Sequence, residues 1–190
     1  MTKLILVRPG YTDWSKAGRI QGQLDIPLNI EGKRQIRSIV ACLANLRGIK
    51  EISAIYTSKL SRSFETAAEV GRIFKLKPNK LSELNELNQG LWQGLLEKEI
   101  EKRYKKLYNI WKSNPVSTAP PKGESLKDAY DRVVSASQKI ADRHRGRAVC
   151  IIAHEIVLTL IKCHYKNLDI AKMWEHVPKN ATLEVLDVKK

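Results

Sequence analysis

The sequence predicts an α/β fold of three layers, with a mostly parallel sheet between two layers of helices. Three short apolar runs, at residues 4–7, 52–57 and 149–153, have the length and composition of buried strands. Apolar residues at helical spacing follow the runs, and a strand, a crossover helix and a second strand form a right-handed parallel unit. We find no internal repeat and no linker, so we expect a single domain over residues 1–190.

The remaining elements follow from local patterns along the chain. Apolar residues spaced three and four apart predict helices at residues 36–43, 64–71, 126–140 and 156–163. Residues 125–128, at the start of the third helix, resemble a capping box. Residues 97–111 are charged and predicted to be helical, whereas residues 113–123 contain three prolines and predict a loop. We expect a short strand within residues 77–84 and a last strand, at a sheet edge, over residues 182–188.

The charge of the chain favours anionic partners. It contains 34 Lys and Arg against 20 Asp and Glu, a formal net charge of +14, and its 43% hydrophobic content is typical of a globular protein. No basic run alternates with aromatic residues, which argues against nucleic acid as the partner. Composition leaves the oligomeric state open.

The three cysteines indicate a reducing compartment. Cys42, Cys150 and Cys163 are odd in number, far apart and without metal-binding spacing, so we interpret them as reduced core thiols and predict neither a metal nor a cofactor. The apolar run near Met1 is too short for a secretory signal, and no run has membrane length. These features predict a cytoplasmic protein that does not enter the membrane.

Three strand ends carry residues suited to binding phosphate. Arg8 follows the first run, Arg62 lies just inside the helix after the second, and His154 ends the run at 149–153. Ligands of parallel sheets collect at the carboxyl ends of the strands. A guanidinium group bonds phosphate oxygens in pairs and stays charged. We therefore predict that these three side chains converge on one site for inorganic phosphate or a small phosphorylated ligand.

The opening of the chain resembles one family in particular. Arg8-Pro9-Gly10 is followed by Trp14-Ser15, by Gly-Arg-Ile-Gln-Gly at 18–22 and by Asp-Ile-Pro-Leu-Asn at 25–29. These residues resemble the histidine phosphatase (phosphoglycerate mutase-like) superfamily, whose signature is Arg-His-Gly with Trp-Asn, Gly-Arg-x-Gln-Gly and Asp-x-Pro-Leu-Asn downstream. The histidine of Arg-His-Gly is the nucleophile of that family. Here Pro9 stands in its place.

The resemblance covers nearly the whole chain, implies a histidine phosphatase-like fold and assigns roles to further residues. It implies that Arg62, in the segment 57–62, holds the phosphate and that His154 binds the phosphoryl group. It also implies that Glu86 is the general acid, which needs a raised pKa near the leaving oxygen. The spacing to the glycines that follow favours Glu86 over Glu83.

Three positions besides Pro9 depart from the family pattern. Tyr11 stands where many members have glutamate, Ser15 stands where an asparagine touches phosphate, and Glu155 replaces the glycine after the histidine. Ser15 still offers one hydrogen bond to a phosphate. We expect Glu155 at a helix N-terminus, either as an ordinary first-turn acid or as an acid that competes with phosphate and alters the ligand.

Three functions remain open on these residues. The first is a phosphate- or phosphoester-binding protein without phosphohistidine turnover, because Pro9 has no nucleophilic side chain. The second is an active phosphomonoesterase in which water, activated by Glu86 or Glu155, or His154 itself, attacks the phosphate. The third is a polyanion or nucleic-acid binder whose affinity depends steeply on salt. Under the first two, residues 16–24 and 97–123 set ligand preference.

Overall fold

The structure is a computed structural model that describes residues 1–46 and 51–188. Its helices and strands are, in chain order, β1 (Thr2–Val7), α1 (Asp13–Lys16), α2 (Ile30–Ala44), β2 (Ile52–Thr57), α3 (Ser61–Phe74), β3 (Asn79–Lys80), α4 (Glu97–Arg103), α5 (Lys105–Ser113), α6 (Leu126–Arg143), β4 (Ala148–Ile152), α7 (Glu155–Lys166) and β5 (Leu183–Val188). Short 3₁₀ helices lie at Ser82–Leu84, Gly90–Trp92, Pro115–Ser117 and Ile170–His176.

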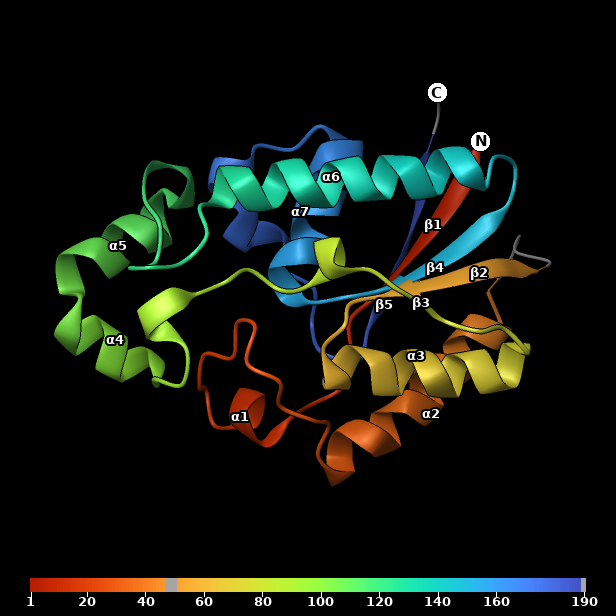
Figure 1. The fold of residues 1–190 in the computed structure, drawn as a ribbon, viewed down its shortest axis with the longest axis horizontal. Coiled ribbons are helices and arrows are strands. Elements are labelled where there is room, and N and C mark those ends of the chain that lie inside the picture. Colours follow the sequence, from red (N-terminus) through yellow and green to blue (C-terminus); the bar gives the residue numbers. More distant parts are fainter. Residues whose placement is uncertain (47–50, 189–190) are drawn as a thin grey trace.

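One sheet organises these elements, with the strand order β3-β2-β4-β1-β5. The pairs β1–β4, β2–β4 and β2–β3 are parallel, and only β5 is antiparallel, at the edge beside β1. Val7 of β1 is level with Ile152 of β4, and Thr57 of β2 is level with the same residue. The predicted mostly parallel sheet and its last edge strand are therefore confirmed, and the carboxyl ends of β1, β2 and β4 meet at one edge (Figure 1).

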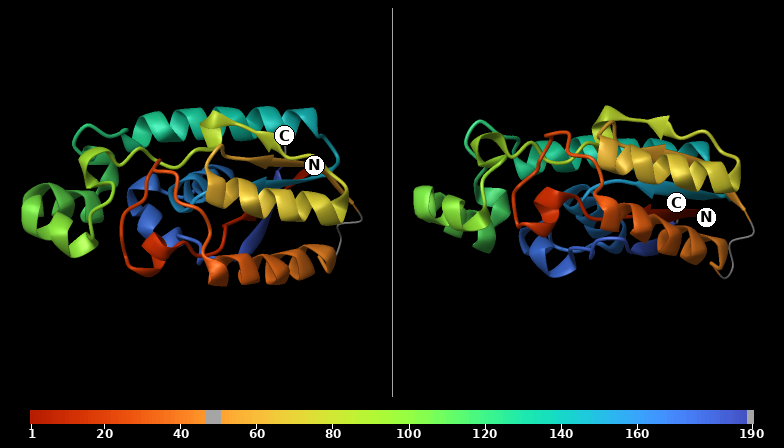
Figure 2. Two further views of the ribbon diagram at one scale, coloured as in Figure 1. Left: turned by 60° about the horizontal axis from the view of Figure 1, so that its bottom comes forward. Right: turned by 90° about the horizontal axis from the view of Figure 1, so that it is seen from below.

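Helices cover both faces of the sheet, which confirms the predicted three layers (Figure 2). Alternate strand residues face opposite layers. On one face Ile5, Ile55 and Cys150 pack with α2 and α3. On the other, Leu4 and Ile151 pack with α6 and α7. Both cores are nearly free of solvent contact, so the strand ends that carry the candidate site stand on a rigid base.

The predicted helix over 97–111 is two helices. Tyr104 interrupts it with φ −127° and ψ 31°, outside the helical region, and α4 ends there before α5 begins. The ring of Tyr104 lies 6.3 Å from that of Trp92, which also meets Tyr108 and Trp111 of α5. Tyr104 at the break and two residues of α5 thus pack around one buried indole, and tertiary packing of this kind can override the local helical preference.

The short strand predicted within 77–84 is confirmed as β3, which covers two residues. Two other points differ from what the sequence predicts. Cys42 is exposed and not a core thiol, since it lies on the solvent side of α2 beside the buried Leu43, whereas Cys150 and Cys163 are buried as predicted. Helix α1 and the 3₁₀ helix within the predicted loop at 113–123 were not expected from the sequence.

The turn after β1 is held against the start of α2 by two glycines. A Cβ at Gly32 would lie 2.1 Å from the carbonyl oxygen of Tyr11, and a Cβ at Gly10 would lie 2.6 Å from that of Gly32. Asn29 caps α2 by accepting a hydrogen bond from the Gly32 amide at 2.8 Å. This close contact determines where Arg8 and the residue after it face at the end of the strand.

Candidate active site

A cavity of about 300 Å³ lies at the carboxyl edge of the sheet. Arg8 borders it directly after β1, Arg62 from the first turn of α3, and His154 from the cap of α7. The three side chains therefore border one cavity, and their convergence on a bound phosphate stays a prediction. Pro9 and Ser15, from the turn after β1 and from α1, line the same cavity.

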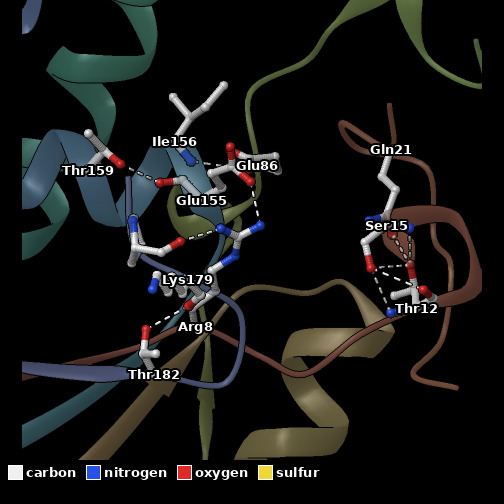
Figure 3. Close-up of polar contacts among 11 residues, drawn as sticks. Arg8, Thr12, Ser15, Gln21, Glu86, Glu155, Ile156, Thr159, Lys179 and Thr182 are labelled. Carbon is white, nitrogen blue, oxygen red and sulfur yellow. Dashed lines mark hydrogen bonds and ion pairs between the residues drawn. The ribbon is translucent and has the colours of Figure 1, made fainter. Parts of the chain in front are cut away.

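The two guanidinium groups are already held by protein atoms. Arg8 donates from Nη1 to the carbonyl oxygen of Pro178 and from Nη2 to the carboxylate of Glu155 (Figure 3). Arg62, which is 5% exposed, donates to the carbonyl oxygens of Leu24 at 2.9 Å and Gly22 at 2.7 Å. These contacts hold both guanidinium groups in place and leave only some of their N–H donors for an anion.

His154 is buried at the N-terminal cap of α7. Its Nε2 lies 2.7 Å from the hydroxyl of Ser58, which also accepts a hydrogen bond from the Leu60 amide. Burial, followed by the charges of Arg62 and Arg8, holds the pKa of His154 well below 6.5. A neutral imidazole can donate a hydrogen bond to a bound anion, and it adds nothing to the positive charge of the cavity.

Glu86 also lines the cavity, as predicted, whereas Glu83 is exposed outside it. The carboxylate oxygens of Glu86 accept hydrogen bonds from the amides of Leu87 at 2.8 Å and Ile156 at 3.2 Å. Burial raises the pKa of Glu86, the charge of Glu155 raises it further, and the two amides and Arg62 oppose the rise. A carboxyl group with a raised pKa suits a general acid.

Arg132 of α6 positions the loop that carries Glu86. Its Nη1 donates to the carbonyl oxygens of Glu83 and Asn85, and its Nη2 to that of Glu86 at 3.3 Å. It also pairs with Glu124, with an Nε–Oε1 distance of 2.5 Å. Sequence patterns do not predict this role, because a single arginine on a helix resembles an ordinary surface charge.

Ser15 belongs to the cap of α1 in this structure. Its hydroxyl donates to the carbonyl oxygen of Thr12 and accepts from the amide of Thr12, and the Thr12 hydroxyl contacts Gln21 Oε1 at 2.9 Å (Figure 3). Thr12 and Gln21 line the cavity, as do Gln89 and Asn180. Gln21 lies within the Gly-Arg-Ile-Gln-Gly motif at 18–22, whereas sequence reasoning gave Asn180 no role at the site.

Residues 4–190 match the sequence model described as "Histidine phosphatase superfamily (branch 1)". The chain belongs to the histidine phosphatase superfamily. It is 30% identical over 189 residues to phosphoserine phosphatase 1 of Hydrogenobacter thermophilus, an alignment covering 100% of this chain and 88% of that relative. Bacillus stearothermophilus YhfR has a similar structure, with a TM-score of 0.87 and 30% identity over 100% of this chain and 92% of the other.

A second solved structure, which contains a bound vanadium oxyanion, also resembles this histidine phosphatase-like chain. It is described as a mycobacterial glucosyl-3-phosphoglycerate phosphatase in complex with VO3, and it has a TM-score of 0.86 and 26% identity over 97% of this chain and 92% of the other. Two of these three similar proteins are described as phosphatases.

Three aromatic side chains also line the cavity of this superfamily member. Tyr108 and Trp111 of α5 line it together with Trp174. Lys112 Nζ lies 5.6 Å from the centre of the Trp174 ring and 3.2 Å from Glu97 Oε1. Residues of the predicted preference segments 16–24 and 97–123 therefore do border the cavity.

Within residues 1–46 and 51–188, no helix combines the length and the apolar character that a membrane span requires. Within the same ranges, no group of three or more His, Cys, Asp and Glu side chains is placed to hold a metal ion.

The buried His154 makes stability depend on pH. Because its pKa is lowered in the folded state, the unfolded chain binds more protons below pH 6.5, and stability falls as pH falls through that range. We expect the difference in unfolding free energy between the wild type and His154→Gln to shrink by up to about 1.4 kcal/mol per pH unit there. Urea unfolding between pH 5 and pH 8 measures this difference, and parallel curves for the two proteins would contradict it.

Proposed function

We propose that this histidine phosphatase-like protein binds a phosphate or phosphoester in the Arg8, Arg62 and His154 cavity without forming phosphohistidine. The observation that supports the proposal is the identity of the residue that follows Arg8. Pro9 lines the cavity at the place of the family's nucleophile and offers no nitrogen that could accept a phosphoryl group. The relatives described as phosphatases support a phosphorylated ligand.

His154 is poorly suited to replace the missing nucleophile. Its ring is 4% exposed, and its Nε2 is engaged with Ser58. Attack on phosphorus requires a ring nitrogen directed along the bond that breaks. We assign His154 the role of holding the anion, together with the arginines, and Ser15 at most one additional contact.

A second function, slow hydrolysis by water, is favoured by Glu86. This carboxyl is buried beside the cavity with a raised pKa, so it could protonate a leaving oxygen while the arginines stabilise the phosphoryl group. Glu155 is the other acid available to a water molecule. Under this alternative, hydrolysis needs no covalent intermediate.

We expect the wild-type protein to bind inorganic phosphate at one saturable site and to form no acid-labile phosphoenzyme with any phosphomonoester. The measurements are calorimetric titration with phosphate and rapid quenching after mixing with a ³²P-labelled monoester. Labelled protein that releases phosphate in acid would contradict the proposal. Binding that falls steeply with salt and never saturates would instead favour the polyanion alternative.

The hydrolytic alternative has its own matched pair of variants. Glu86→Gln removes the candidate acid, and Glu83→Gln removes an exposed acid from the same loop. Turnover that is present in wild type and Glu83→Gln but lost in Glu86→Gln would establish water-based hydrolysis. Equal turnover in all three proteins would indicate a contaminating phosphatase.

We also propose that residues 1–190 form a single domain in the cytoplasm. One sheet lies between both helical layers, and Arg8 and His154 of the cavity closely follow two of its strands, which supports one domain. The free thiols of Cys42, Cys150 and Cys163 are compatible with a reducing compartment.

A further inference from the structure

A carboxylate of the protein itself occupies the cavity, against one of the two guanidinium groups. Glu155 lies in the first turn of α7, as predicted, and its Oε2 accepts a hydrogen bond from Arg8 Nη2 (Figure 3). The other end of the Arg8 fork donates to Pro178, so the guanidinium is held between a loop carbonyl and this acid. The side chains of Arg8 and Glu155 are 14% and 37% exposed.

The same end of α7 already carries a second acid. The Ile156 amide, one of the free donors of the first helical turn, donates to Glu86. The positive end of the helix dipole is therefore shared by Glu86 and Glu155. Because both acids lie at this helix end, the helix dipole attracts an incoming anion less strongly there.

The charges of Arg8, Arg62 and Glu155 sum to a single positive charge. Arg8 and Arg62 contribute two positive charges, and Glu155 removes one. His154 and Glu86 are held towards their neutral forms by burial. The charge of Arg132 behind His154 is offset by its ion pair with Glu124.

We propose that Glu155 makes this cavity selective for a singly charged phosphate, a phosphodiester, over the dianion of a phosphomonoester. The inference rests on the proposed function, because it assumes that the cavity binds a phosphoester. A dianion would neutralise Arg8 and Arg62 but would lie beside the carboxylate of Glu155, and like charges in a partly buried site repel strongly. A diester carries only one negative charge, so one guanidinium group that is not paired with an acid is enough to neutralise it.

The test compares two probes that differ by one charge. Phenyl phosphate is mostly dianionic at pH 8, and methyl phenyl phosphate is the singly charged diester with the same ring. Calorimetric titration of each into wild type, Glu155→Gln and the control Glu83→Gln gives six dissociation constants. Glutamine preserves the size of the side chain and removes its charge.

We expect wild type and Glu83→Gln to bind the diester at least as tightly as the monoester. In Glu155→Gln the monoester should bind about tenfold tighter or better, because one repulsive unit charge has been removed, while the diester changes by less than about threefold. A gain in affinity cannot result from misfolding. If the variant does not fold, the order of the two wild-type affinities still decides.

Three results would overturn the inference. They are a wild type that prefers the monoester, equal tightening of both probes in Glu155→Gln, and no change in either. Each leaves binding in the cavity intact and so leaves the proposed function standing. Binding of neither probe by any of the three proteins would instead overturn the proposed function, and the inference with it.

Discussion

Replacing Pro9 by histidine is expected to convert a protein that forms no phosphoenzyme into one that does. Arg8, Arg62, His154 and Glu86 already line the cavity into which the new imidazole would project. The carbonyl oxygen of residue 9 accepts a hydrogen bond from the Ala181 amide, a contact that histidine preserves. We expect the yield of acid-labile phosphoenzyme to rise at least about tenfold over background.

The size of this gain depends on the geometry around Arg8. A misplacement of about 1 Å can cost roughly a hundredfold in rate. Glu155 also holds Arg8, so Pro9→His combined with Glu155→Gln should give more phosphoenzyme than Pro9→His alone. Rapid quenching with a ³²P-labelled monoester measures the yield.

Pro9→Ala is the matched control, because it removes the ring without adding a nucleophile. We expect it to remain at background. Turnover that is equally robust in wild type and in Pro9→His would refute the claim that this position decides activity. That result would favour attack by water or by His154.

Removing the guanidinium of Arg62 is expected to weaken both the fold and the binding of phosphate. Arg62 is buried and donates to the carbonyl oxygens of Gly22 and Leu24, which hold the 18–24 loop over the cavity. Charged hydrogen bonds of this kind contribute about 1.5–3 kcal/mol each, so Arg62→Ala should lower the free energy of unfolding by about 3 kcal/mol. Phosphate affinity should fall by about a hundredfold or more.

Arg72→Ala is the control on the same helix. Arg72 is exposed and pairs with Glu69 at 3.0 Å, so its loss should cost less than about 1 kcal/mol and leave phosphate binding unchanged. Arg62→Lys retains the charge without the planar fork and should fall between the two. Unchanged phosphate affinity in a folded Arg62→Ala protein would remove Arg62 from the proposed site.

The parts of this protein that were predictable from sequence are those that local patterns determine. Each apolar run of four to six residues became a strand, and a parallel sheet requires that such strands end at one edge. Arg8, Arg62 and His154 were therefore placed together without any knowledge of distances. The absence of a nucleophile at Pro9 is likewise a property of the residue type, which no folding can change.

Tertiary structure decided the state of those side chains. Glu155 lies 147 positions from the arginine it binds, and Arg62 lies 40 and 38 positions from the two carbonyls that it holds. Arg132 reaches the Glu86 loop across 46 positions. No local pattern encodes contacts of this kind, because each depends on how separate segments approach once the sheet has formed.

The break at Tyr104 shows the same limit within one segment. The charged stretch 97–111 favours a continuous helix, yet Tyr104 is non-helical, and its ring packs with Trp92, twelve positions earlier, which also contacts Trp111 of α5. By itself the sequence determined which residues meet at the edge of the sheet and that residue 9 cannot accept a phosphoryl group. Packing and long-range ion pairing decided how much positive charge the cavity retains for a ligand, since desolvation and pairing depend on neighbours that only the folded chain supplies.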